Sequence, residues 1–400
     1  MKHVSRRGFL QAMGIGTGAL IGTRLAGSSL LGVAQAATPE PTTLVVVYLT
    51  GGFNAIFTGA DAFTNVAFGV TAGNSTALGG GVVIDNALAN AIPAGIRNKV
   101  ASVGIRHGIT DHGNAERSLF LSGNASAPLM LADAMGGTGA IKAAVVGAGT
   151  LPNGERPAPV NGVSLQPIND MKATIEAIAG AANAPNLADR PTMAKGLMAA
   201  RTMSKGAVTK HPVSLVSVDQ GLQSAIATVQ KPVQVFNAAE FNTAYALNNV
   251  TAVNGFSAQM AAAELMVRSG ANVVVAPDGF NWDSHGDSNG TNVRNQMTQR
   301  IAPSLNTFLT RMVLNATAER NVVVAIMGDF HRSLPGSDHQ GNLAALVIGK
   351  TLKNATTGKT DANVAQPPNT PSIAGFWQLM SAATKTDTAP FGANPHAVLA

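Results

Sequence analysis

Residues 43–52 read TLVVVYLTGG, an unbroken apolar and β-branched run that ends in two glycines. A continuous apolar run, rather than an alternating one, is typical of a strand that is buried on both faces of a parallel sheet. The stretch therefore predicts a buried strand from Thr43 to Leu49. Similar runs occur at residues 100–105, 143–146, 213–218, 272–276, 321–327 and 343–348. Together these runs predict a large, mostly parallel sheet.

Helical patterns lie between the apolar runs. Residues 261–268 are followed by Gly270, a typical helix C-cap, and then directly by the run at 272–276. A second helix carries one apolar stripe with spacings of four, four, three and four: Met297, Ile301, Leu305, Phe308 and Met312. Strand, helix and strand in this order form a right-handed crossover unit, so the pattern favours a doubly wound α/β fold.

The sheet pattern is interrupted once and ends before the last residues. Residues 150–212 are rich in Pro, Asn and Ala, and we expect them to form a helical insertion or cap within one α/β domain at 37–356. Residues 357–400 have many Thr, Asn and Pro residues, which is typical of a C-terminal tail. One short helix is expected there, around residues 374–383.

The N-terminus has the three parts of an export signal. Arg6 and Arg7 are followed by Phe9 and Leu10, then by a glycine-rich apolar stretch, and then by Ala34-Gln35-Ala36. Paired arginines indicate the twin-arginine translocase, so we predict a signal peptide at 1–36 and a periplasmic or secreted protein. Arg24 and several glycines interrupt the apolar stretch, which argues against a stable membrane span.

Charge and composition exclude several classes of protein. The chain of 400 residues has 27 basic and 21 acidic residues, a net charge of +6, and no cysteine. Cleavage after Ala36 would remove four basic residues and no acidic ones, leaving a net charge of +2. With no block of like charges left, we expect no nucleic-acid partner. The absence of cysteine excludes disulfides, iron–sulfur clusters and a thiol nucleophile.

Three Asp–His pairs could form a site. They are Asp283 with His285, Asp329 with His331, and Asp338 with His339. The first two follow apolar runs, and the carboxyl ends of parallel strands line the ligand crevice of such a sheet. Carboxylate and imidazole without thiolate suit zinc or manganese in a hydrolytic site. The alternative is that Asp283 and Asp338 cap turns. Three pairs within 57 residues favour a shared divalent-metal site.

These motifs resemble a known family in their order and spacing. They are VVVYLTGGFN, Trp282-Asp283-Ser284-His285-Gly286 and Gly328-Asp329-Phe330-His331-Arg332. Over about residues 40–350 the chain is similar to the twin-arginine-exported family called domain of unknown function 1501, in the alkaline phosphatase/sulfatase superfamily. The resemblance implies an alkaline phosphatase-like sheet with a metal-supported anion site at the carboxyl ends of its strands.

The resemblance also implies roles for single residues. Asp283 and His285 resemble ligands of one metal, and His339 resembles a ligand more closely than Asp338 does. Asp329 stands where the family has Glu, so a carboxylate is kept. His331 replaces a glycine of that motif and could add a ligand or block one. Arg332 matches an arginine that could bind phosphate or sulfate oxygens in two places.

Two departures from the family pattern leave the activity open. Asn54 stands where the family carries Asp, and an amide holds a dication less well than a carboxylate does. Ser118 is either a nucleophile at a helix N-terminus or an N-cap residue, and Leu119 replaces the family's His. His112 and Asn114 lie just before it and could compensate. We expect a hydrolase acting on a small phosphate or sulfate ester. The alternative is a catalytically decayed binding or structural protein.

Overall fold

The structure, a computed structural model, describes residues 42–53, 55–58, 71–137, 140–147, 151, 157–179, 190–211, 219, 222–223, 226, 237–248, 251–287, 289–315, 320–332, 338–358, 360, 366–386 and 390–400. The signal peptide predicted at 1–36, the apolar run at 213–218 and Asn54 lie outside these residues, so they stay predictions. No helix within the described ranges has the length and apolar character needed to cross a membrane.

The chain divides into two compact units. The described residues between Lys172 and Phe236 belong to one unit, whose main element is helix α6 (Arg190–Lys210). There Arg201 forms an ion pair with Asp219 at 2.8 Å. The other unit contains the described chain up to Met171 and from Asn237 onward. Helix α5 (Met171–Ala179) begins at the boundary between them.

The second unit is built on one eight-stranded sheet. Its strands, in spatial order, are β12 (Ala355–Thr357), β4 (Val100–Arg106), β11 (Asn342–Gly349), β10 (Asn321–Gly328), β1 (Thr42–Leu49), β9 (Val273–Asp278), β7 (Ala143–Val146) and β8 (Leu165–Ile168). All neighbours pair in parallel except β11, which runs antiparallel to both β10 and β4. The expected mostly parallel α/β sheet is therefore confirmed.

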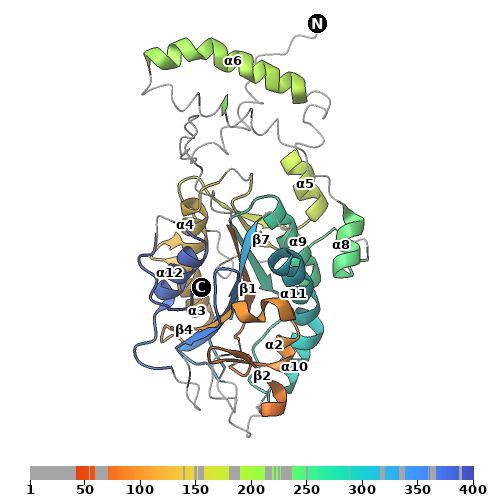
Figure 1. Cartoon of the computed structure of the whole chain (residues 1–400), viewed down its shortest axis with the longest axis vertical. Helices are drawn as coiled ribbons and strands as arrows, with labels where there is room; N and C mark the ends of the chain where they lie inside the picture. The colour runs from red at the N-terminus through yellow and green to blue at the C-terminus, as the bar shows by residue number, and fades with distance from the viewer. Residues whose placement is uncertain are drawn as a thin grey trace. The chain divides into compact units, whose positions relative to one another are not determined.

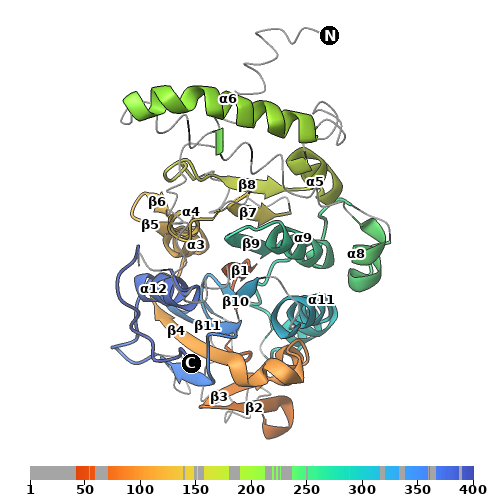
Figure 2. The ribbon, with the colours of Figure 1, turned by 45° about the horizontal axis from the view of Figure 1, so that its top comes forward.

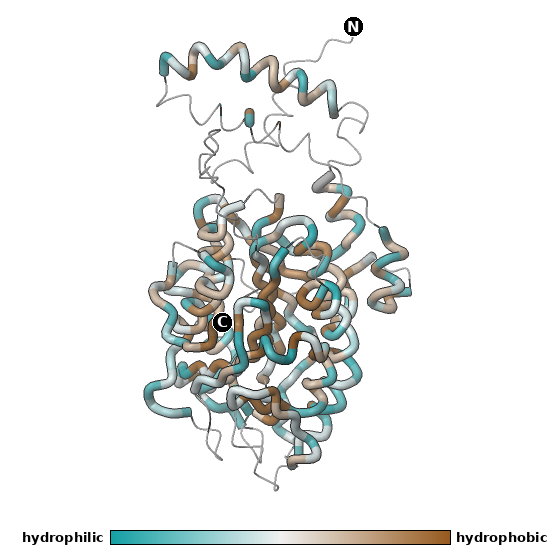
Figure 3. Tube along the Cα trace, in the orientation of Figure 1, coloured by the Kyte–Doolittle hydropathy of each residue, from teal (hydrophilic) through white to brown (hydrophobic). Residues whose placement is uncertain are grey.

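Strand β1 lies inside this sheet and explains why its sequence is apolar throughout. All of its residues from Thr42 to Leu49 are buried, and it pairs with β10 on one side and β9 on the other. Leu44, Val46 and Tyr48 face a hydrophobic core that also contains Phe120. The residues between them point to the opposite face, where helices also cover the sheet. Figure 3 shows the strands at the centre of this unit as mostly hydrophobic.

Helices cover both faces of the sheet (Figures 1 and 2). On one face lie α3 (His112–Phe120), α4 (Ala127–Ala134) and α12 (Ile373–Ala383). On the other lie α9 (Phe256–Arg268) and one long helical run made of α10 (Thr291–Gln296), η6 (Met297–Ile301), α11 (Ala302–Leu309) and η7 (Thr310–Leu314). The predicted apolar stripe of this run is buried, and η6 and η7 are π-helical turns.

Helix α9 ends as its sequence predicts. Gly270 has a φ of +89°, a left-handed conformation that glycine adopts without strain. The N–H of Ala271 donates to Met266 O at 2.9 Å and that of Gly270 to Val267 O at 3.0 Å. These two hydrogen bonds form a Schellman C-cap, which turns the chain directly into β9.

One of the predicted segments differs from the structure, and one predicted helix is confirmed. Strand β8 lies inside the stretch predicted as an insertion, yet it pairs with β7, so the prediction was wrong for residues 165–168. Beyond residue 357, helix α12 confirms the predicted short helix and packs its Phe376 and Trp377 into the core. The smaller elements are η3 (Ala72–Asn74), β2 (Ser75–Gly79), β3 (Val82–Asp85), α2 (Asn86–Ala89), η4 (Ala94–Lys99), β5 (Leu121–Ser122), β6 (Ala125–Ser126) and α8 (Ala238–Tyr245).

Candidate metal centre

The antiparallel strand β11 brings four chain segments to one edge of the sheet. Strands β1, β9 and β10 all end there, since Leu49 pairs with both Asp278 and Gly328. Because β11 runs in the opposite direction, it begins where its neighbours end, and its first residue Asn342 pairs with Arg106 at the end of β4. The loops after β4, β9 and β10 therefore meet the segment that precedes β11.

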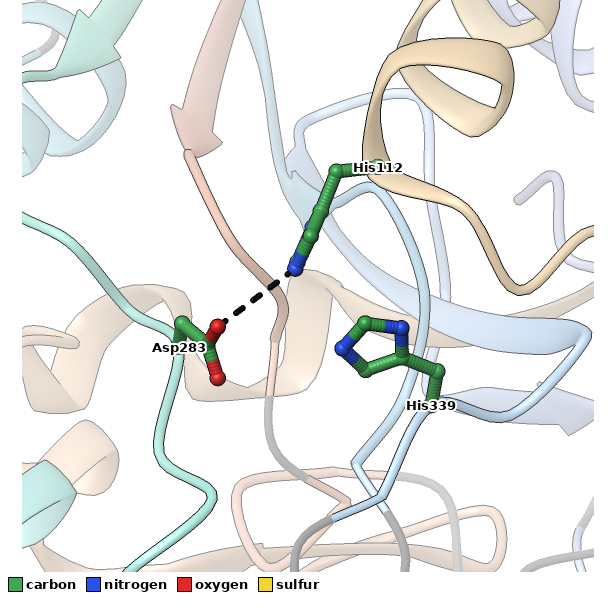
Figure 4. Close-up of side chains that lie close together, drawn as sticks. All are labelled: His112, Asp283 and His339. Carbon is green, nitrogen blue, oxygen red and sulfur yellow. Dashed lines mark ion pairs between the residues drawn. The ribbon is translucent and has the colours of Figure 1, made fainter.

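Three side chains from these loops converge on one point (Figure 4). His112 is the first residue of α3, Asp283 lies in the loop after β9, and His339 precedes β11. One ligand atom from each lies within 4.8 Å of the other two. His112 Nε2 and Asp283 Oδ2 are 3.6 Å apart. Two ligands of a tetrahedral zinc ion, each at about 2.0–2.1 Å, lie about 3.4 Å apart, so the spacing suits one ion.

Asp329 orients the first of these ligands. It lies just after β10 with 1% of its surface exposed, and its Oδ2 accepts a short hydrogen bond from His112 Nδ1. That bond is the main reason why the pKa of His112 is raised above its usual value. In the neutral ring Asp329 holds the proton on Nδ1, so that Nε2 presents a lone pair toward Asp283. A carboxylate behind a ligating histidine is a common feature of metal sites.

The tautomer of His339 is set in the same way, by a backbone carbonyl. Its Nδ1 donates to Thr110 O at 2.6 Å, which leaves the lone pair on Nε2. That Nε2 is buried and has no hydrogen-bond partner among the described residues. Burial and the nearby charge of Arg332 lower the pKa of His339, so the ring stays neutral. A buried acceptor without a partner is costly, and a metal ion would satisfy it.

Asp283 carries the negative charge of the cluster. Its Oδ1 accepts a hydrogen bond from His285 Nδ1 and lies 2.7 Å from Arg332 Nη2. Partial burial opposes ionisation of Asp283, but the charge of Arg332 together with the hydrogen bond from His285 and the charges of His285 and His112 outweighs it, and the pKa of Asp283 is lowered. Arg332 is completely buried, and its Nε and Nη2 donate to Gly51 O at 3.0 and 2.6 Å. Its Nη2 also lies 3.4 Å from His112 Nε2.

The two glycines after β1 make this close packing possible. Gly51 and Gly52 have φ values of +98° and +126°, which side chains rarely adopt. A Cβ on Gly51 would lie 2.7 Å from the backbone nitrogen of Asp283, and one on Gly52 would lie 2.9 Å from Arg332 Nε. The glycine pair therefore lets the Asp283 loop and the Arg332 guanidinium approach the end of β1.

His285 and Asp338 lie at the rim of the cluster. The His285 side chain is half exposed and bonded to Asp283, and its ring centroid lies 4.8 Å from that of His339. Asp338 is exposed, and of the predicted Asp338–His339 pair only His339 belongs to the three-residue set. If these three residues held an ion, positions would remain for water or substrate, as in catalytic zinc sites.

His331 is not brought to the cluster. It is fully buried, its Nε2 accepts a hydrogen bond from the N–H of Ala344 at 2.7 Å, and burial lowers its pKa to about 3. The expectation that Asp329 and His331 point to one place was wrong. Alternation of side chains holds only within a strand, and β10 ends at Gly328, before both residues. His331 N donates instead to Asn342 O of β11.

Ser118 is not at a helix N-terminus, so that expectation was also wrong. Helix α3 begins at His112, and Asp111 caps it by accepting a hydrogen bond from Asn114 N at 2.9 Å. Ser118 lies in the last turn, six residues after His112, which corresponds to a rise of about 9 Å along the helix. The helix N-terminus instead presents His112, which the sequence pattern had indicated only as a possible substitute for the family's missing His.

Comparisons with known proteins give no match to this chain. None of the protein-family models, curated proteins or solved structures matches it. The resemblance to domain of unknown function 1501 therefore depends on the sequence motifs alone, and the alkaline phosphatase-like assignment stays a prediction. What the structure adds is the α/β fold and the cluster of His112, Asp283 and His339, which could hold a metal ion.

Proposed function

We propose that the protein is an exported, metal-dependent hydrolase of a small phosphate or sulfate ester. His112, Asp283 and His339 would hold one zinc or manganese ion. The observation that carries the proposal is the lone pair of His339 Nε2, which is buried without a partner beside the other two ligands. Two imidazoles and one carboxylate are a known ligand set of hydrolytic zinc.

The residues around the cluster favour an anionic substrate. A bound metal ion supplies an activated water molecule and neutralises oxygens of the substrate. Arg332 adds a second positive charge beside the cluster. Its Nη1 lies 3.2 Å from His285 Nδ1, and its Nη2 lies 2.7 Å from Asp283 Oδ1. Because Arg332 already neutralises Asp283 Oδ1, we propose one metal ion rather than two.

We propose that water, rather than Ser118, is the nucleophile. Ser118 lies in the last turn of α3, whereas His112 at the start of the same helix belongs to the ligand set. Asp329 can keep the proton on His112 Nδ1 throughout, so that Nε2 remains a ligand. The alkaline phosphatase-like fold that the motifs imply is compatible with the mostly parallel sheet.

One observation favours the alternative, a catalytically decayed binding or structural protein. The guanidinium of Arg332 is completely buried and bonded to Gly51 O, so it acts as part of the framework as much as an anion ligand. In this case the site would hold a metal without turning over an ester. Leu119, where the family has His, is a fully buried core residue.

The test is turnover by the full chain loaded with zinc or manganese. We expect hydrolysis of p-nitrophenyl phosphate or p-nitrophenyl sulfate. Asp283→Asn should reduce kcat/KM by about a hundredfold or more, because removal of the anionic ligand costs about 3 kcal/mol. Asp338→Asn, an exposed change beside His339, and Ser118→Ala should leave the rate within about twofold. Metal-loaded protein that hydrolyses none of the esters would overturn the hydrolase and support the alternative.

A further inference from the structure

The residue before the ligand Asp283 is fixed at two points. Trp282 is 1% exposed, and its indole Nε1 donates to Asp278 Oδ2 at 2.9 Å. Its backbone N–H donates to Thr50 O at 2.8 Å, at the end of β1. Asp278 is itself the last residue of β9 and 1% exposed. The position of the Trp282–Asp283 peptide is therefore tied to the ends of two neighbouring strands.

Arg300 holds the other oxygen of the same carboxylate. Its Nη2 donates to Asp278 Oδ1 at 2.9 Å, so both oxygens of Asp278 are engaged. Its guanidinium also lies over the ring of Phe280, at 4.8 Å from the centroid. The Phe280 ring in turn packs edge-on against Trp282, with centroids 5.8 Å apart. Arg300 thus contacts the loop that carries Asp283 both through Asp278 and through Phe280.

The backbone around Arg300 departs from α-helical geometry. Arg300 lies in the π-helical turn η6, Met297–Ile301, within the long helical run. Pro303 follows in α11 and has no N–H to donate to the preceding turn, which accounts for the break in the regular pattern. π-Helical turns inside α-helices occur often at functional sites. Here the π-helical turn contains Arg300, whose guanidinium bonds to Asp278 at the end of β9.

We propose that Asp278 and Arg300 are positioning residues for the metal centre, acting on the ligand Asp283 through Trp282. This inference rests on the metal site proposed above. An ion pair with a buried carboxylate adds little net stability, because desolvation offsets most of the attraction. The hydrogen bonds of the Asp278 carboxylate do restrict the position of Trp282. Mutation of residues behind a metal ligand typically changes metal affinity by about ten- to a hundredfold.

The chain contains a matched control in Arg268 of α9. The Arg268 and Arg300 side chains are 33% and 38% exposed, and each pairs with a fully buried carboxylate, Glu264 or Asp278. Each also lies over a phenylalanine ring, Arg268 over Phe241 at 5.9 Å. Only the Arg300 pair is bonded to the residue next to a ligand. If zinc affinity fell only because the protein became less stable, substitution of either arginine would lower it. If Arg300 positions Asp283, only substitution of Arg300 would lower it.

The experiment measures zinc affinity of the full chain by competition with a chromogenic chelator. We expect Arg300→Gln and Trp282→Phe to weaken zinc binding about tenfold. We expect Arg268→Gln to leave it within about twofold, although Tm falls in both arginine variants. Cobalt(II) should report the same difference, with an altered visible spectrum in the first two variants and an unchanged one in Arg268→Gln. Trp282→Phe removes the indole N–H together with part of the buried ring, keeps an aromatic ring against Phe280, and carries the test if Arg300→Gln does not fold.

The outcomes separate this inference from the proposed function. Wild-type protein that binds zinc, with Arg300→Gln and Trp282→Phe binding it equally well, would overturn the positioning role and leave the metal centre intact. Equal losses in Arg300→Gln and Arg268→Gln would also overturn it, since the effect would then come from stability. Wild-type protein that binds no zinc would overturn the proposed metal centre itself.

Discussion

Two buried charged clusters in the sheet unit differ in whether their buried acceptors all have donors. Glu264 of α9 is 0% exposed, and both of its oxygens have donors. Arg311 Nε lies 3.0 and 2.8 Å from the two oxygens, and Tyr245 OH donates to Oε2 at 2.6 Å. Arg268 adds a further contact at 2.5 Å. Within the described part of the chain, Arg268 Nε is buried without a hydrogen-bond partner here, but it is a donor, so this cluster has no unpaired acceptor that a cation would satisfy.

The cluster of His112, Asp283 and His339 contrasts with it. Here two histidines have their Nδ1 protons fixed by Asp329 and Thr110 O, so both Nε2 lone pairs face the same carboxylate. Their lone pairs and the carboxylate are all acceptors, and His339 Nε2 has no partner among the described residues. Burial by itself therefore does not identify a functional site. A buried acceptor without a donor separates the candidate metal centre from the structural cluster.

The largest effect that we expect on stability comes from the paired cluster. Glu264→Ala leaves Arg311, Arg268 and Tyr245 without their buried acceptor, and loss of one partner of a buried pair costs about 3–5 kcal/mol. The urea midpoint should fall accordingly. Glu240→Ala removes a partly exposed partner of the same arginines and should cost only about 1 kcal/mol. Zinc affinity should be unchanged in both. A stable Glu264→Ala protein with weakened zinc binding would reverse the contrast between the clusters.

His339→Ala should produce the opposite pattern. Binding energies of about 10–16 kcal/mol at protein zinc sites are shared among the ligands, so one ligand is worth about 3 kcal/mol, or about a hundredfold in affinity. Without metal, loss of the imidazole removes one hydrogen bond, from Nδ1 to Thr110 O, and one unpaired acceptor, Nε2, so stability should change by only about 1 kcal/mol. Isothermal titration and urea unfolding measure the two quantities. His211→Ala, an exposed change outside the sheet unit, is the control. Zinc affinity equal to wild type in His339→Ala contradicts the assignment.

Asp329→Asn should change the pH dependence of zinc binding. Asp329 raises the pKa of His112, and zinc needs the neutral ring, so affinity should rise with pH through that raised pKa. The amide removes the charge that raises the pKa. The pH midpoint of the rise in zinc affinity should then move to lower pH, while zinc affinity at high pH falls about tenfold. Titrations between pH 5 and about 9 test this. An unmoved midpoint would show that Asp329 does not control the His112 proton.

The same bond affects the metal-free protein with a definite sign. Because the pKa of His112 is higher in the folded state, the protonated ring contributes stability below the unfolded pKa of about 6.5. That contribution is lost as pH rises through the higher folded value. Asp329→Asn should therefore reduce stability more at pH 6 than at pH 9, in metal-free samples. Equal losses at both pH values would contradict it.

The smallest effect concerns a buried histidine that belongs to neither cluster. His396 is 3% exposed, its Nδ1 is bonded to Thr357 Oγ1 at 2.8 Å, and burial lowers its pKa to about 4. The folded state then binds fewer protons than the unfolded state between pH 4 and about 6.5, so stability falls as pH decreases through this window. His396→Gln should make Tm less dependent on pH there. An equally steep dependence would show that the ring is not held neutral.

The sequence predicts the sheet well because burial on both faces produces continuous apolar runs. All the predicted strands that lie within the described residues are present. The direction of β11 was not predictable, because an apolar run carries no direction. Strand β8 was missed since it lies at the edge of the sheet, contains Pro167, and exposes residues 166 and 167. Edge strands lack the apolar pattern that marks central ones.

The site was predictable only in part. The Asp–His pairs correctly brought Asp283 and His339 together, since both lie next to the ends of buried strands. His112 was underestimated, although Asp111-His112 is a further Asp–His pair after a strand, and Asp111 is a typical N-cap. His331 shows the limit of spacing arguments. Two residues that follow a strand point the same way only while the chain stays extended.

Metal content is the most direct test of whether His112, Asp283 and His339 bind an ion. The full chain and its His339→Ala variant are exposed to equimolar zinc and manganese, passed through a desalting column, and analysed by inductively coupled plasma mass spectrometry. We expect about one ion per wild-type chain and less than about a tenth of an ion in the variant. No stoichiometric metal in the wild-type protein, or equal amounts in both, would contradict it.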